Sequence, residues 1–164
     1  MEMRKSLLRG LGLTYRMLYR LPAVGDPLVR GIGKCIAFLG HHSPYGMKDG
    51  GSTAALRRDL ERALGAMKVG GFEIREQEGK VELILGSCPY GFGRPGHAGV
   101  CDAAMEQDRA MVAYVGARLV IGESIPSGAP ACRVSILLPG TKADADRACR
   151  GVAPPSGDEN SGLR

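Results

Sequence analysis

Hydrophobic residues recur at helical spacing through the N-terminal part of the chain. In residues 4–20 they fall on one face at intervals of three and four, which predicts an amphipathic helix. Asp26 followed by Pro27 predicts the start of a second helix, because aspartate caps helix N-termini and proline suits the first helical position. Gly40 is expected to end it. The expected inner face of this helix holds Leu28, Ile32, Cys35, Ile36 and Leu39.

Further along, the spacing of the apolar residues predicts one more helix and then strands. The third helix is expected to begin at Ser52 or Thr53 and to stop at Gly70-Gly71, after a loop over residues 40–52. Apolar and polar residues then alternate over residues 72–76 and return over 81–85, which predicts a β-hairpin. A loop over residues 88–97 leads to a fourth helix at 98–116, and residues 118–125 and 131–138 predict a second hairpin.

This element order, α-α-α-β-β-α-β-β, predicts an α+β fold. Sequential hairpins favour an antiparallel sheet, and we expect the helices to pack on one face of it. The length of 164 residues suits a single domain, assigned here to residues 1–139, of which residues 1–50 form an N-terminal helical part. Residues 140–164 are polar and rich in Pro, Gly and Ser, so we expect a mobile C-terminal tail.

Charge is unevenly distributed along the chain. The formal net charge of +5 arises within residues 1–35, which hold seven basic and two acidic side chains, whereas the remaining positions sum to zero. This distribution disfavours nucleic-acid binding, which usually spreads Lys and Arg over a docking face. It favours docking of residues 1–35 on an acidic partner or membrane surface, with an ordinary core-covering helix as the alternative.

Neither a transmembrane segment nor a secretory signal is expected. Apolar runs fall short of the roughly 20 residues that a membrane span needs. Arginines continue through the N-terminal segment, where a signal peptide would instead be apolar. We therefore expect a cytoplasmic protein, in which a disulfide framework is not favoured.

Five cysteines stand at positions 35, 88, 101, 132 and 149. Cys88 follows a predicted strand, Cys101 lies in the first turn of the fourth predicted helix, and Cys132 begins the last strand. In an α+β fold these three places can converge at one end of the sheet. Cys35 is expected in the core, and Cys149 as a surface thiol in the tail. The trio lacks the C-x2-C spacing of a structural zinc site, whereas iron–sulfur clusters accept wider spacing.

The expected surroundings of Cys101 suit an anionic group. The unpaired N–H groups and positive dipole end at the start of a helix stabilise a thiolate, so we expect a lowered pKa for this cysteine. The neighbouring loop contains Gly91, Gly93 and Gly96, which would let backbone amides approach an anionic cluster or ligand.

Three motifs within residues 72–138 occur together. They are Cys88-Pro89-Tyr90, Cys101 after twelve intervening residues, and Ser127-Gly128-Ala129 followed by Cys132-Arg133-Val134. The set resembles the ligand-sensing domain related to the 4-vinyl-reductase family, which binds hydrocarbons or tetrapyrroles. It is especially similar to the C-terminal domain of iron–sulfur-responsive Suf repressors.

This resemblance implies an α+β fold and an iron–sulfur cluster ligated by Cys88, Cys101 and Cys132. The role it implies is sensing or accessory work for a protein partner, or within a homodimer. Zinc, and a small hydrophobic ligand without any metal, are the alternatives to the cluster.

Two features depart from the pattern of those repressors. No helix-turn-helix is evident in residues 1–50, and Ser124 stands across the last turn from Cys132, where those proteins often carry a fourth thiol. The fourth ligand is therefore open among Ser124, His97, Asp102, Cys35 and an outside molecule. An open ligand position suits a labile or substrate-binding cluster.

A second resemblance points to an enzyme. Cys101-Asp102, the hairpin from Gly128 to Cys132 and the segment at 21–25 are similar to the L-2-amino-thiazoline-4-carboxylate hydrolase-like family. That family implies a cysteine- or metal-dependent hydrolase of C–N or C–S bonds. Cys101 would be its nucleophile, His97 its base and Asp102 a further catalytic candidate.

Two other motifs carry less weight. The string Gly91-x-Gly93-x-x-Gly96 fits the dinucleotide fingerprint, but the βαβ frame that this fingerprint needs is missing. His41-His42 lies in a predicted loop without nearby carboxylates, so we expect it to be solvated rather than metal-bound.

Overall fold

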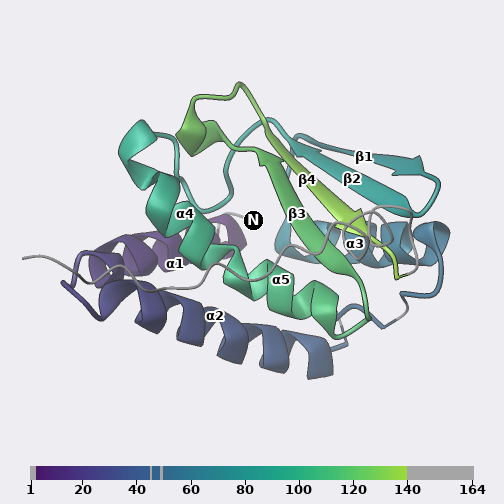
Figure 1. The fold of residues 1–164 in the computed structure, drawn as a ribbon, viewed down its shortest axis with the longest axis horizontal. Coiled ribbons are helices and arrows are strands. Elements are labelled where there is room, and N and C mark those ends of the chain that lie inside the picture. The colour runs from purple at the N-terminus through teal and green to yellow at the C-terminus, as the bar shows by residue number, and fades with distance from the viewer. Residues whose placement is uncertain (1–2, 45, 49, 140–164) are drawn as a thin grey trace, which may run out of the picture.

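The computed structural model describes residues 3–44, 46–48 and 50–139, and it confirms the predicted α+β fold and element order (Figure 1). The predicted tail at 140–164, with Cys149, lies outside the described residues. In chain order the elements are α1 (Met3–Tyr19), α2 (Gly25–His42), α3 (Thr53–Met67), β1 (Phe72–Gln77), β2 (Lys80–Leu85), the 3-10 turn η1 (Pro95–His97), α4 (Ala98–Ala104), α5 (Glu106–Ala113), β3 (Arg118–Glu123), the 3-10 turn η2 (Ile125–Ser127) and β4 (Cys132–Leu137).

The strands form a four-stranded antiparallel sheet in the order β1-β2-β4-β3. The two predicted hairpins are present, and the sheet is completed by pairing of β2 with β4. The helices lie on one side of the sheet, as predicted (Figure 1). In that layer α2 packs on α4 and α5, and α1 packs on α2 and α4, so the shorter helices separate the α1–α2 hairpin from the sheet.

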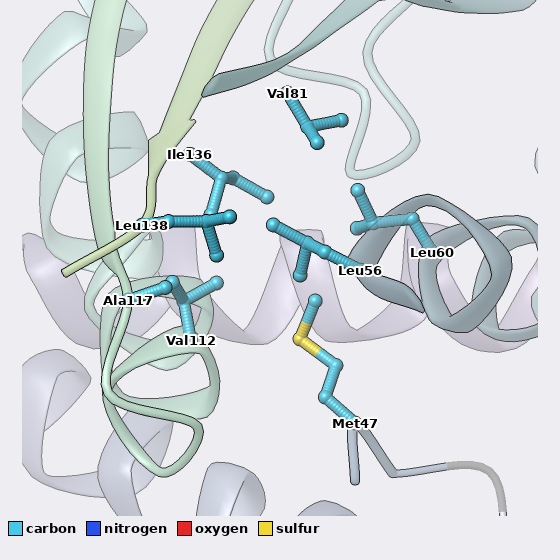
Figure 2. Close-up of a cluster of buried hydrophobic side chains, with 8 residues drawn as sticks. All are labelled: Met47, Leu56, Leu60, Val81, Val112, Ala117, Ile136 and Leu138. Carbon is cyan, nitrogen blue, oxygen red and sulfur yellow. The ribbon is translucent and has the colours of Figure 1, made fainter. Parts of the chain in front are cut away.

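Two hydrophobic clusters hold these layers together. The first lies between the sheet and α3, where strand side chains such as Val81 and Ile136 meet Leu56 and Leu60 (Figure 2). The second joins α1, α2, α4 and the loop after β2, and it includes the fully buried Tyr15 and Phe92. Cys101 belongs to this second cluster, and Cys88 packs against it. The candidate site is therefore built on a packed core.

The single helix predicted over 98–116 is wrong in detail. The structure divides it into α4 and α5 at Met105, and α5 ends at Ala113. The end is fixed by Gly116, whose φ of +74° reverses the chain, while the Ala117 N–H donates to the carbonyl of Val112. The early stop of α2 at Gly40 is also wrong. The helix continues through His41 and His42.

The inner face predicted for α2 also needs correction. The buried residues of α2 are Gly25, Val29, Gly33 and Ala37, whereas Leu28, Cys35 and Leu39 are exposed. The reason is close packing. A Cβ on Gly33 would lie 3.0 Å from the backbone nitrogen of Gln107 on α5, so only small residues fit there. Ile32 and Ile36 of the predicted face nevertheless pack against the second cluster.

Candidate functional site

The three central cysteines come from three elements that meet at one end of the sheet. Cys132 begins β4 and pairs with Leu85, the last residue of β2. Cys88 lies three residues after Leu85, in the loop that follows β2. Cys101 lies on α4, and this helix packs against the η2 turn. The η2 turn in turn contacts Cys132, because the Ile125 N–H donates to its sulfur at 3.3 Å. This arrangement agrees with the convergence expected from the sequence.

The thiols influence one another electrostatically. Burial, followed by the charges of Cys88 and Cys132, raises the pKa of Cys101 to about 12. Burial also raises the pKa of Cys132, with a further contribution from Cys88 and an opposing one from the Ile125 N–H. The expectation that the helix start would lower the pKa of Cys101 is therefore wrong. The thiol is only 9% exposed, and loss of hydration outweighs the helix dipole.

The described side chains were also considered as ligands of a single metal ion. Within that part of the chain, no group of three or more His, Cys, Asp or Glu residues is placed to hold one ion. A tetrahedral zinc ion draws its sulfurs together, because each Zn–S bond is only about 2.3 Å long. The cysteines are close enough to affect each other's charge, yet they are not gathered on one ion.

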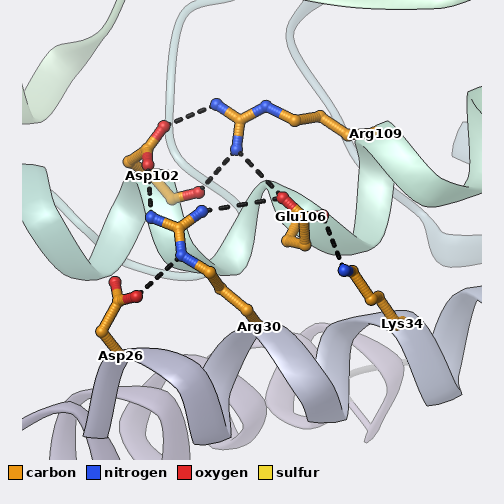
Figure 3. A network of polar contacts seen from close by, with 6 residues as sticks. All are labelled: Asp26, Arg30, Lys34, Asp102, Glu106 and Arg109. Carbon is orange, nitrogen blue, oxygen red and sulfur yellow. Dashed lines mark hydrogen bonds and ion pairs between the residues drawn. The ribbon is translucent and has the colours of Figure 1, made fainter. Parts of the chain in front are cut away.

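Asp102 is tied into an ion-pair network that joins three helices (Figure 3). Its carboxylate accepts hydrogen bonds from Arg30 on α2 at 2.8 Å and from Arg109 on α5 at 2.5 Å. Arg30 also donates to Asp26 at 2.8 Å. Asp26 does not cap α2 as predicted, because the helix begins at Gly25 and Val24 occupies the N-cap position. The two arginines hold the pKa of Asp102 below its usual range. This carboxylate therefore stays ionised and is occupied in joining helices.

His97 lies in a positively charged neighbourhood. Partial burial, and then Arg16, Arg94 and Arg20, lower the pKa of its imidazole. Its ring packs edge-on against Phe92, with 6.0 Å between the ring centroids. The histidine is thus held neutral near neutral pH, which suits a base or a ligand, but no hydrogen bond to Cys101 is found among the described residues.

The other candidates for a fourth ligand have different surroundings. The Ser124 hydroxyl lies 2.7 Å from that of Ser127 and forms a hydrogen bond with it within the η2 turn. Cys35 is exposed on α2, so the prediction that it lies in the core is wrong. Among the described residues neither side chain forms a hydrogen bond with the three central cysteines, although Ser124 lines the same pocket as Cys101.

An open pocket of about 650 Å³ lies beside Cys101. Its walls come from α4, α5, β3 and η2. They include both acidic and basic side chains, namely Asp102, Glu123, Arg109 and Arg118. Glu123 is exposed and pairs with Arg133 at 2.9 Å. The Nε of Arg118 is buried and has no hydrogen-bond partner in the described structure. The lining thus combines charged side chains with apolar ones such as Leu119 and Ile121.

One ionisable residue near the cysteines was missed by the sequence reasoning. Burial raises the pKa of Asp108, on α5, to about 6. Its charge also contributes to the raised pKa of Cys101 and of the buried Tyr90. The signal was present in the sequence, because Ala104, Asp108 and Val112 share one helical face at intervals of four. A carboxylate within an apolar stripe could have been singled out.

The two weaker motifs do not form sites. Gly91 and Gly93 precede the short η1 turn, and Gly96 lies within it. All strand pairs in the described residues are antiparallel, so the βαβ frame is absent there. His41 and His42 are helical. The His41 ring stacks on Tyr114 and His42 packs edge-on against Phe38, with centroid separations of 4.5 and 4.6 Å.

Comparison with known proteins adds no family assignment. No protein-family model matches the chain, and no curated protein matches its sequence. The two motif resemblances described above therefore remain predictions. Among the described helices, none combines the length and apolar character required to cross a bilayer.

Proposed function

We propose that the chain binds an iron–sulfur cluster through Cys88, Cys101 and Cys132 and acts as a sensor or accessory protein for a partner. The observation that carries the proposal is the convergence of these three cysteines at one end of the sheet, from β4, α4 and the loop after β2. Thiolates are the usual protein ligands of iron–sulfur clusters. Because such a cluster contains several iron atoms, its cysteine ligands can lie further apart than the ligands of a single metal ion.

The surroundings of the trio support a cluster over zinc. The three thiols are mutually close without being gathered on one ion. Cys88 stands in a glycine-rich loop that includes Gly91, whose φ is +74°, so its backbone can adjust as a cluster binds. The fourth position is best assigned to an outside molecule, since Asp102 is engaged by arginines and Cys35 is exposed on α2. The pocket beside Cys101 gives such a molecule access.

The alternative is a small cysteine-dependent hydrolase that uses Cys101, His97 and Asp102. The pocket beside Cys101 favours it, because a substrate could reach the sulfur. Two observations weigh against it. The Cys101 thiol is buried with a pKa near 12, and Asp102 is occupied by two arginines. A nucleophilic cysteine needs a thiolate at working pH.

The test is oxygen-free purification or reconstitution, followed by iron and sulfide determination and a visible spectrum. We expect a brown protein with stoichiometric iron and sulfide. Serine substitution of Cys88, Cys101 or Cys132 should lower the iron content severalfold, whereas the matched variants Cys35→Ser and Cys149→Ser should keep it. Iron content that is equal in all five variants would contradict the proposal. A colourless protein that hydrolyses small thiazolines would support the alternative.

A further inference from the structure

Exposed apolar side chains are concentrated on the α1–α2 hairpin. Of the eleven large hydrophobic side chains that are exposed in the described residues, eight lie between positions 7 and 39: Leu7, Leu13, Met17, Leu21, Val24, Leu28, Phe38 and Leu39. Single exposed hydrophobic residues are normal on a protein surface, but a concentration of this kind marks an interaction site.

Six of these side chains lie on the two helices, and Leu21 and Val24 lie in the turn that joins them. On α1 the inner face holds Tyr15, which is fully buried, and Gly12, which contacts the backbone of Tyr90. With 100° between successive residues, Leu13 and Met17 fall on the opposite side of that helix. The inner face of α2 packs on α4 and α5, which lie between α2 and the sheet (Figure 1). The exposed apolar side chains of α2 do not belong to this packed face.

The same hairpin carries positive charge without a matching acid. Arg9 and Arg16 on α1, and Arg20 directly after it, lie along one flank of the helix, and none forms an ion pair with a carboxylate of the described residues. Arg9 and Arg20 are exposed, whereas Arg16 is partly buried and, like Arg20, lies near His97. The one acid in residues 3–44 is Asp26, and Arg30 already engages it at 2.8 Å. Within residues 3–44 no acid is therefore left to pair with these arginines, which leaves them able to contact an external anionic group.

We propose that the outer face of the α1–α2 hairpin docks on an anionic membrane surface. Its apolar side chains would enter the boundary between headgroups and acyl chains, and its arginines would contact the lipid phosphates. A second copy of the chain is a poorer occupant. A two-fold axis through this face would bring the unpaired arginines of both copies together. Their positive charges would repel, because the face offers no free carboxylate to neutralise them. None of the three central cysteines lies on this face, so the proposal is independent of the cluster.

Vesicle flotation with the full-length protein tests this inference. We expect binding to vesicles of phosphatidylcholine mixed with phosphatidylserine, little binding to phosphatidylcholine alone, and a bound fraction that falls as salt rises. The double variants Arg9→Glu/Arg20→Glu and Leu13→Gln/Met17→Gln should each reduce the bound fraction severalfold. The matched controls Arg58→Glu/Lys68→Glu and Met67→Gln/Val120→Gln change exposed residues elsewhere and should bind as wild type does. Circular dichroism checks that each variant is folded.

Several results would overturn the proposal. One is that the wild-type protein does not bind the anionic vesicles. Another is that the bound fraction falls equally in the hairpin variants and in the control variants. A dimer in analytical ultracentrifugation that Leu13→Gln/Met17→Gln disperses, without vesicle binding, would assign the face to a second copy. Retention on an acidic polypeptide without vesicle binding would assign it to an acidic protein.

Discussion

The carboxylate of Asp102 on α4 accepts a hydrogen bond from Arg30 on α2 across 2.8 Å, although 72 positions separate the two residues. This contact fixes the residue next to Cys101 to the outer helical layer. Arg109 completes the arrangement from α5, so one carboxylate joins three helices. Asp102 thus holds the helix that carries Cys101 in place, which is a structural role and differs from the catalytic role that the hydrolase resemblance implies.

Asp102→Asn should weaken the fold modestly and leave cluster binding intact. The pairs are partly exposed, so we expect a loss of about 1 kcal/mol in the free energy of unfolding at neutral pH. Because the folded-state pKa of Asp102 is lowered, its contribution is complete above the unfolded value and is lost as pH falls below about 4. Urea titrations at neutral and acidic pH measure both effects.

The exposed pair of Glu73 and Arg75, which lies within β1, provides the control for Asp102→Asn. Glu73→Gln should lower the free energy of unfolding less than Asp102→Asn does, because the pair of Glu73 and Arg75 lies within one strand and joins no separate elements. A loss of bound iron in Asp102→Asn protein that is still fully folded would contradict the structural role.

Two glycines of α1 should respond in opposite directions to alanine. A Cβ on Gly12 would lie 2.1 Å from the carbonyl oxygen of Tyr90, whereas a Cβ on Gly10 would have no atom within 4 Å. We expect Gly12→Ala to cost about 1–3 kcal/mol through overpacking and Gly10→Ala to stabilise the protein by up to about 1 kcal/mol through helix propensity. Thermal or urea unfolding of the two variants measures this difference. Equal shifts would show that α1 does not approach Tyr90 as described.

Asp108→Asn should stabilise the protein at neutral pH. Burial raises the folded-state pKa of Asp108 to about 6, well above the usual value of about 3.9 for an aspartate. The folded state therefore binds more protons between these two values, and the stability contributed by this group falls as pH rises through about 6. Removing the charge should recover about 1–3 kcal/mol near neutral pH, since one pKa unit corresponds to about 1.4 kcal/mol. Urea unfolding at pH values on both sides of 6 should show a flatter profile for the variant; a parallel profile would contradict the shift.

The sequence was informative about elements and less informative about contacts between them. Alternation and turn residues predicted both hairpins, because these signals are local. The apolar spacing of α2 predicted its inner face only in part, since Ile32 and Ile36 do pack against the second cluster. The burial of Gly33 and Ala37 was not predicted, because it depends on close approach to α5, which no local pattern encodes. For the site, positions at element ends correctly suggested that the central cysteines converge. The pKa of Cys101 could not be predicted, because burial depends on the packing of distant segments.

The reactivity of Cys101 separates a cluster ligand from a catalytic nucleophile. Alkylation requires the thiolate, and a pKa of about 12 leaves almost none at neutral pH. In iron-free protein we therefore expect iodoacetamide to modify the exposed Cys35 first and Cys101 last, with the Cys101 rate rising steeply in alkaline solution. Peptide mapping after short labelling times gives the rate at each position. Denatured protein provides the control, since all cysteines should then react at similar rates. Labelling of Cys101 ahead of Cys35 in the folded, iron-free protein would instead mark an activated nucleophile and favour the hydrolase.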